Sequence, residues 1–151
     1  MRKTVVVALI GALAAGAMVG GATVALAQAD VIKARQDNRK QAGAAMRAIK
    51  AVVDAKGPTA PAVAEAAKLK TLEAAFVKMF PAGSGTGETK ALPVIWTDWA
   101  GFEAASKASD VAYDKLAVAA GSGNAEALAA AFADTGKTCG ACHDKFRAKA
   151  N

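Results

Sequence analysis

The chain has 151 residues, of which 54% are hydrophobic and 21% are charged, and its formal net charge at pH 7 is +6. This length is enough for one domain whose core needs no disulfide staples. No run of Lys or Arg is interleaved with aromatic residues, so the sequence argues against a nucleic-acid partner. A modest cationic surplus is ordinary for solubility, and it also suits docking to an acidic protein partner.

The first 27 residues have the features of an export signal. A basic pair, Arg2 and Lys3, precedes an apolar stretch that is rich in Ala, Gly and Val and ends at Ala27 in an Ala-Leu-Ala triplet. Such a small-x-small triplet is typical of a signal peptidase site. The sequence therefore predicts a cleaved signal peptide over residues 1–27, a mature domain over residues 28–151 and a periplasmic location. An uncleaved membrane anchor is the alternative, because the apolar stretch is long enough to span a bilayer.

The mature sequence is interrupted at three places rich in Gly or Pro, at residues 57–58, 81–93 and 121–123. Between these breaks, apolar residues recur every three or four positions and β-branched residues are few, which predicts helices. The predicted helices span residues 29–56, 61–80, 94–120 and 124–146.

Each predicted helix carries one stripe of residues at helical spacing, and the stripes mark the expected core. They are Arg35, Arg39, Ala42, Met46, Ile49 and Val53 in the first helix; Val63, Leu69, Leu72, Phe76 and Phe80 in the second; Ile95, Trp99, Phe102, Ser106, Ser109, Tyr113, Leu116 and Ala120 in the third; and Leu128, Phe132, Thr135, Cys139, Cys142 and Phe146 in the fourth. Pro61 suits the first turn of the second helix, and Asn124 suits the N-cap of the fourth.

These stripes predict an all-α fold. Their 3-4 spacing is that of helices packed at a shallow angle, as in antiparallel four-helix bundles. Short links make neighbouring helices antiparallel, while the longer link between the second and third helices must cross or cover something. We therefore expect an up-down-up-down four-helix bundle.

The most specific pattern lies near the end of the chain, where residues 139–143 read Cys-Gly-Ala-Cys-His. Cys-x-x-Cys-His is the signature of covalent attachment of a c-type haem. Two thiols bond to the haem, and the adjacent imidazole becomes an axial ligand of the iron. The chain has no other cysteine and no other histidine. We therefore expect one haem c, attached through Cys139 and Cys142 with His143 as the iron ligand, between the helices near one end of the bundle.

Two other uses of these residues stay open. A Cys-x-x-Cys pair can be a dithiol redox site with Cys139 as the nucleophile, but such a motif opens a helix soon after a β-strand, and this chain has almost no strand-like segments. Zinc can take Cys139, Cys142, His143 and a carboxylate, but three ligands so close in sequence do not easily surround a tetrahedral ion.

The mature part of the chain resembles the cytochrome c′ family, the class II c-type cytochromes, whose haem motif is at the C-terminus. The resemblance rests on Val-Ile-Lys-Ala-Arg-Gln at residues 31–36, Phe-Pro-Ala-Gly at 80–83, Ile-Trp at 95–96, and the haem motif followed by Asp-Lys-Phe-Arg at 144–147. It covers essentially the whole mature chain.

By this resemblance, Arg35 and Gln36 match positions that approach the haem propionates, and a guanidinium suits that task because it pairs with carboxylates. Arg147 matches an arginine beside the proximal haem face, where it can influence ligands that arrive on that side. The loop before Pro93 approaches the haem edge, and Thr89 is the best match there. A homodimer through the first two helices is a further implication of the resemblance.

The chain departs from the family pattern at Arg39, which stands where the family places the side chain facing the sixth iron position. In high-spin members that side chain is apolar, and in low-spin relatives it is an iron-binding methionine. Arginine is a very poor iron ligand and is costly to bury unpaired, so we expect Arg39 to turn to solvent or to a propionate, or the helix to shift its register. Met46, roughly 10 Å further along the helix, and Met79 are expected to fill the core. A five-coordinate iron, or one with a weakly held water, follows.

The expected function is electron transfer in the periplasm, with periplasmic or membrane-bound redox proteins as partners. The alternative is a protein that binds a diatomic gas, nitric oxide or CO, at an open iron site. A peroxidase-like enzyme needs a distal acid or base, and the single histidine is used on the iron, so we expect no enzymatic activity.

Overall fold

The computed structural model describes residues 19–149, with side chains from Gln28 onward, so the predicted signal peptide and its cleavage site lie outside the described side chains. Within this part of the chain the long helices are α1 (Val19–Ala55), α2 (Pro61–Phe76), α4 (Trp99–Gly121) and α5 (Ala125–Phe146). The short helices η1 (Val77–Met79) and α3 (Val94–Thr97) belong to the link between α2 and α4. None of the described helices has the length and apolar character needed to cross a membrane.

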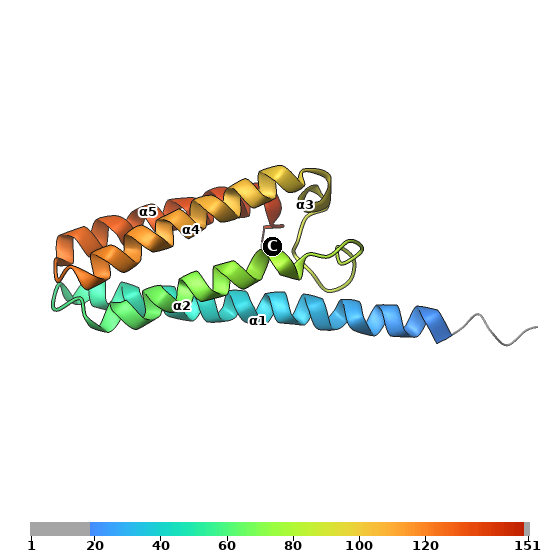
Figure 1. The fold of residues 1–151 in the computed structure, drawn as a ribbon, viewed down its shortest axis with the longest axis horizontal. Coiled ribbons are helices and arrows are strands. Elements are labelled where there is room, and N and C mark those ends of the chain that lie inside the picture. Colours follow the sequence, from blue (N-terminus) through green and yellow to red (C-terminus); the bar gives the residue numbers. More distant parts are fainter. Residues whose placement is uncertain (1–18, 150–151) are drawn as a thin grey trace, which may run out of the picture.

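The long helices form two layers that run along the same axis (Figure 1). Helices α1 and α2 make one layer, α4 and α5 make the other, and α2 also packs against α4. Consecutive long helices run in opposite directions, with the α1–α2 and α4–α5 turns at the same end (Figure 1). The predicted up-down-up-down bundle is confirmed.

Local chemistry explains most helix ends. Pro61 occupies the first turn of α2, as predicted. The Asn124 side chain accepts hydrogen bonds from the backbone N–H groups of Glu126 and Ala127 at 2.9 and 3.0 Å, which confirms it as the N-cap of α5.

Two predicted helices are shorter than the sequence indicated. The predicted helix over residues 94–120 is broken at Asp98, whose side chain accepts a hydrogen bond from the Gly101 N–H at 3.1 Å and so caps a new helix. The second α-helix ends at Phe76 and tightens into the 3₁₀ turn η1 before Pro81, since residues preceding proline disfavour the α conformation.

The core has two parts. An aliphatic cluster fills the end of the bundle that holds the two turns; its buried members are Ala42, Ala45, Ile49, Ala62, Ala66, Leu69, Tyr113, Leu116, Ala120 and Leu128. An aromatic cluster lies at the other end, with Phe80, Ile95, Phe102 and Phe146 as its buried members. The inward stripes are as predicted except in α2, where Val63 is 43% exposed and the buried face is Ala62, Ala66, Leu69 and Glu73.

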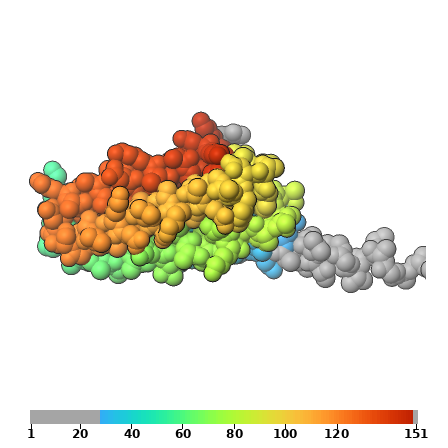
Figure 2. Space-filling model, turned by 45° about the horizontal axis from the view of Figure 1, so that its top comes forward, coloured from blue at the N-terminus to red at the C-terminus, as the bar shows by residue number. Residues whose placement is uncertain are grey.

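The link between α2 and α4 is hydrogen-bonded to the C-terminal end of α5 and to the residues that follow it. The backbone N–H of Leu92 donates to the Phe146 carbonyl at 3.0 Å, and the N–H of Ala148 donates to the Lys90 carbonyl at 2.8 Å. In the space-filling view the end of α5 accordingly lies beside the start of α4 (Figure 2). The link therefore closes the aromatic end of the bundle over the last turn of α5.

Candidate functional site

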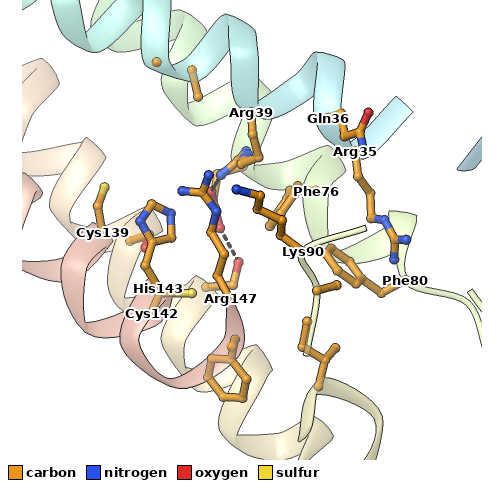
Figure 3. A pocket seen from close by; sticks show the side chains of 18 of the residues that line it. Arg35, Gln36, Arg39, Phe76, Phe80, Lys90, Cys139, Cys142, His143 and Arg147 are labelled. Atoms are coloured by element: carbon orange, nitrogen blue, oxygen red, sulfur yellow. Dashed lines mark hydrogen bonds and ion pairs between the residues drawn. The ribbon is translucent and has the colours of Figure 1, made fainter. Parts of the chain in front are cut away.

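A cavity of about 630 Å³ lies inside the bundle between the two core clusters. That volume is within the range of small-molecule and cofactor sites. Helix α1 supplies the largest share of its lining, with further side chains from α2, α4, α5 and the long link. Figure 3 shows Cys139, Cys142 and His143 on α5 and Arg147 just after its end, with Arg39 extending into the same space from α1.

Both cysteines line the cavity as half-buried free thiols in the C-terminal half of α5. Burial raises the pKa of both thiols. The Tyr113 hydroxyl, which is buried, lies 3.9 Å from Cys139 Sγ. A dithiol redox pair needs a thiolate, which a helix N-terminus or nearby cation favours. The motif instead lies far from the start of α5, so the redox alternative loses support.

His143 lines the same cavity one helical turn beyond Cys139. Desolvation lowers the pKa of His143, and the charges of Arg147 and Arg39 lower it further. The neutral imidazole that these effects favour is the form that binds metals. Among the described residues, no three Cys, His, Asp or Glu side chains converge as a zinc site would require.

Arg39 is paired with a buried acid, an arrangement that the sequence did not predict. Its Nη1 lies 2.8 Å from Glu73 Oε2, and its Nε donates to Asn38 Oδ1 at 2.8 Å. The guanidinium carbon lies 3.7 Å from the centre of the Phe76 ring. Glu73 in turn accepts a hydrogen bond from the Ser106 hydroxyl at 2.6 Å. The cost of burying Arg39 is thus offset by a carboxylate on the neighbouring helix.

Arg35 and Gln36 line the cavity but are also bound to the long link. Arg35 is 5% exposed, donates to the Ser84 carbonyl at 2.7 Å and lies over the Phe80 ring at 4.6 Å. Burial lowers the pKa of Arg35. Gln36 Nε2 donates to the Glu88 carbonyl at 2.8 Å. In Figure 3 the Arg35 side chain accordingly points toward Phe80.

Thr89 and Arg147 also line the cavity. The Thr89 hydroxyl accepts a hydrogen bond from the Ala91 N–H at 3.1 Å, which fixes the loop. Ala91 and Arg147 form an isolated antiparallel bridge. This bridge brings Lys90 beside Arg147 at the cavity, so a cation that the sequence reasoning missed joins the site.

The two methionines differ in position. Met46 lines the cavity and packs against the aliphatic cluster. Met79 packs against the aromatic cluster and is not part of the cavity wall. Of the two, only Met46 has access to the cavity.

Glu73 on α2 and Ser106 on α4 are buried residues of the cavity wall to which the sequence analysis gave no functional role. Glu73 is 4% exposed and continues the buried α2 face that begins at Ala62. A charged residue at helical spacing on that face was a signal, but the alanine-rich sequence of α2 did not reveal which face is buried. Ser106 lay on the predicted stripe of its helix without an assigned role.

The charges around the cavity are mostly positive. Arg35, Arg39, Lys40, Lys90 and Arg147 line it, and Glu73 is the carboxylate in its described lining. Phenyl rings and aliphatic side chains make up much of the remaining wall. Two thiols and an imidazole therefore border an apolar space with a cationic rim, which fits a flat apolar macrocycle that carries carboxylates and a metal. The fold and this site together define the class of c-type haem proteins built on a four-helix bundle.

Comparisons with known proteins agree with this class. The model of the family Cytochrome C′ matches residues 30–147. A cytochrome c′ of Rubrivivax gelatinosus is 39% identical over 107 residues, covering 70% of this chain and 80% of the relative. A cytochrome c′ of Rhodospirillum rubrum is 33% identical over 152 residues, covering 98% of this chain and 99% of the relative. The chain belongs to the cytochrome c′ family.

Solved structures show the same fold. The crystal structure of the Rubrivivax gelatinosus protein matches with a TM-score of 0.74 at 32% identity, covering 80% of this chain and 97% of that one. A nitric oxide complex of a variant of cytochrome c prime from Alcaligenes xylosoxidans matches with a TM-score of 0.74 at 35% identity, covering 81% of this chain and 97% of that one. As a member of this family, the chain carries covalently bound haem c.

Proposed function

We propose that this protein is an exported cytochrome that transfers single electrons through one haem c. The observation that carries the proposal is the meeting of both thiols and the only imidazole of the chain on one cavity with a cationic rim. When bound, the haem supplies an iron that changes between the ferric and ferrous states. Periplasmic or membrane-bound redox proteins are the partners.

Each residue of the site has a distinct task in this proposal. Cys139 and Cys142 would hold the haem by thioether bonds, and His143 would be the axial iron ligand. Arg35 and Gln36, with Thr89 at the loop edge, would hold the propionate side, where a buried guanidinium stabilises a carboxylate. Arg147 would lie beside the His143 face and add positive charge there.

Burial supports the electron-transfer task. The wall of the cavity is largely apolar, and the aromatic cluster closes one side of it. A low-polarity surrounding and fixed nearby charges set the potential of a haem. Positive charges from Arg35 and Arg147 favour the ferrous state, because it carries one positive charge fewer than the ferric state, whereas Glu73 neutralises Arg39.

The test is the mass and the spectrum of the protein exported from a host that matures c-type cytochromes. We expect a haem adduct on the mature chain and reversible reduction. His143→Ala should retain haem poorly or show an altered spectrum. An unmodified polypeptide from a host whose maturation is working would refute the proposal, and normal bands from the His143→Ala protein would refute the ligand assignment.

Binding of a diatomic gas is a second function, favoured by a specific observation. The residue at the α1 position that faces the iron in the resemblance is Arg39, which cannot ligate it, and the nearest methionine, Met46, packs with the aliphatic cluster. An open sixth position would admit nitric oxide, the ligand in the Alcaligenes xylosoxidans complex. A low-spin ferric spectrum that does not change with nitric oxide would refute this second function.

The location follows from the same proposal. Haem attachment to Cys-x-x-Cys-His takes place outside the cytoplasm in bacteria, and residues 1–27 have the pattern of a signal peptide. N-terminal sequencing of the exported protein should give Gln28 as the first residue. A start at Met1 in a membrane fraction would indicate the anchored alternative.

A further inference from the structure

The Arg39–Glu73 pair is a charged group built into the wall of the cavity. The two side chains are 29% and 5% exposed, and both line the same space as Cys139, Cys142 and His143. The pair joins α1 to α2, and Ser106 joins it to α4 by its hydrogen bond to Glu73. Three helices therefore fix its position.

The guanidinium of Arg39 is held in one orientation. Its Nε and Nη2 donate to Asn38 Oδ1 at 2.8 and 2.5 Å, Nη2 reaches the Leu72 carbonyl at 3.4 Å, and Nη1 donates to Glu73 at 2.8 Å. A guanidinium has five N–H bonds. These contacts use four of them among the described residues. One N–H, on Nη1, is left for a further acceptor.

The Arg39 side chain lies across the cavity from the haem motif on α5. Arg39 and Glu73 line the same cavity as Cys139 and Cys142, so the pair and the thiols border one space. In Figure 3, Arg39 enters that space from α1 while His143 enters from α5. Cys139, Cys142 and His143 would hold the haem on α5, and by the resemblance the α1 position of Arg39 would face the haem on the side away from His143.

The surroundings of the pair favour a negatively charged ligand. Arg39 has a single carboxylate partner in Glu73, while Arg35, Lys40, Lys90 and Arg147 add positive charge around the same cavity. A guanidinium N–H binds an anion with a charge-assisted hydrogen bond. Polarity and hydrogen-bond donors in the distal pocket decide which ligands a haem binds.

We propose that Arg39, positioned by Glu73 and Asn38, binds small anionic ligands of the iron, so that the ferric protein's affinity for hydrogen-bond-accepting anions such as fluoride and cyanide depends on Arg39 far more than the ferrous protein's affinity for neutral CO. The inference rests on the proposed attachment of haem to α5 with His143 as its ligand. It assigns Arg39 as the residue that determines ligand specificity, and Glu73 as the residue that positions Arg39 and partly neutralises its charge.

The first experiment titrates the ferric holoprotein with fluoride and the ferrous holoprotein with CO. Arg39→Leu should weaken fluoride binding roughly 10- to 100-fold, the scale of a hydrogen bond to a charged group, and change CO affinity much less. The CO stretching frequency should rise, since a positive donor beside the bound CO is gone. Arg47→Leu is the matched control, because it removes the same charge from an exposed part of α1 away from the cavity lining.

A second variant should change fluoride affinity in the opposite direction. Glu73→Gln keeps the shape and one acceptor oxygen for Arg39 Nη1, since the Ser106 hydroxyl can accept from the new amide N–H, but it removes the negative charge beside Arg39. Fluoride should then bind more tightly, by roughly two- to tenfold, because the guanidinium is less neutralised. If Arg39→Leu fails to fold with Glu73 left unpaired, Arg39→Leu combined with Glu73→Gln removes both charges and should show the same loss of fluoride affinity.

Several results would overturn the inference. Arg39→Leu behaving like Arg47→Leu in fluoride binding and CO frequency would do so, as would an equal loss of fluoride and CO affinity, which indicates a purely structural role. Weaker fluoride binding by Glu73→Gln would contradict the assigned role of Glu73. These results all require haem-loaded protein, so absence of haem from the wild-type chain refutes the proposed function instead and is recognised by its missing Soret band.

Discussion

The two ends of the bundle are packed by different kinds of side chain. At the turn end, alanines on α1 and α2 face leucines on α4 and α5 in the aliphatic cluster. At the other end, the rings of Phe80 and Phe102 lie 4.8 Å apart in a T-shaped pair, and charged side chains surround a cavity of about 630 Å³. Small side chains let helices approach closely, whereas large rings and charges hold them apart. The same four helices are thus closely packed at the turn end and surround the candidate haem site toward the other end.

The two ends also differ in whether protein side chains alone complete their packing. The aliphatic cluster is complete within the protein, with Ile49, Leu69, Leu116 and Leu128 fully buried. The cavity end is lined by two thiols, an imidazole and several cationic side chains, which suit a bound haem. A ligand that binds the folded state alone stabilises it. We therefore expect haem to stabilise the cavity end far more than the turn end.

The largest expected effect comes from Cys139→Ser combined with Cys142→Ser, which removes both attachment points. The cavity end should loosen, so amide hydrogen exchange should become much faster in residues 80–93 and 139–147, while residues 42–49 and 116–128 stay protected. Hydrogen exchange followed by mass spectrometry measures this. Wild-type chain made without haem should match the variant, and uniform exchange along both proteins would break the comparison.

A cavity made at the turn end should have the next largest effect. Leu116 is fully buried in the aliphatic cluster, so Leu116→Ala should lower the free energy of unfolding by about 2–5 kcal/mol. Urea denaturation measures the change, and the haem spectrum should stay as in the wild type. Val118→Ala, on the same helix with Val118 75% exposed, should change stability by less than about 0.5 kcal/mol. A spectral change in Leu116→Ala would show that the two ends are coupled.

A smaller effect is expected at the turn between α4 and α5. Asn124→Ala removes the side-chain acceptor of two backbone N–H groups and should cost about 1 kcal/mol of stability. Asn124→Asp keeps an acceptor and should stay close to the wild type. Thermal denaturation compares the three proteins. Equal losses in both variants would mean that the cap does not stabilise α5.

The smallest effect concerns acid sensitivity at the cavity end. A hydrogen bond from Lys145, together with one from the Gly101 N–H, holds the pKa of Asp98 below its ordinary value. A lowered pKa stabilises the folded state at pH values above the unfolded pKa, and this contribution is lost as the pH falls through the folded pKa. Asp98→Asn keeps the cap but not the charge, so its stability should fall less steeply below about pH 4. Lys145→Met should show the same flatter profile in acid denaturation, and a profile as steep as that of the wild type would exclude a role for the pair.

Much of the fold could be predicted because it depends on local chemistry. The periodicity of residues 124–146 and the cap at Asn124 gave the last helix almost to the residue. The same reasoning missed the break at Asp98, since an aspartate within a periodic stretch is as often exposed as capping. It also chose Val63 for the buried face of α2, because alanine on every side leaves little contrast between faces.

The candidate site likewise has a part that the sequence predicted and a part that it did not. The haem motif and its place on the inner stripe of α5 were readable from the sequence, since two thiols and an imidazole within one helical turn have a specific chemistry. Arg39 was recognised as an anomaly, but its partner was not. Glu73 lies 34 residues further along the chain, and no local pattern connects the two.

The sequence by itself determined the helices, their order and the attachment motif, because hydrogen bonding, periodicity and covalent chemistry act over a few neighbouring residues. Only the tertiary structure decided that Glu73 and Ser106 meet Arg39, that Lys90 joins Arg147, and that the cavity has a positive rim. These contacts depend on how α1, α2, α4 and the long link pack around one another. These partners matter because a buried charge without a partner lowers the stability of the folded state by several kcal/mol.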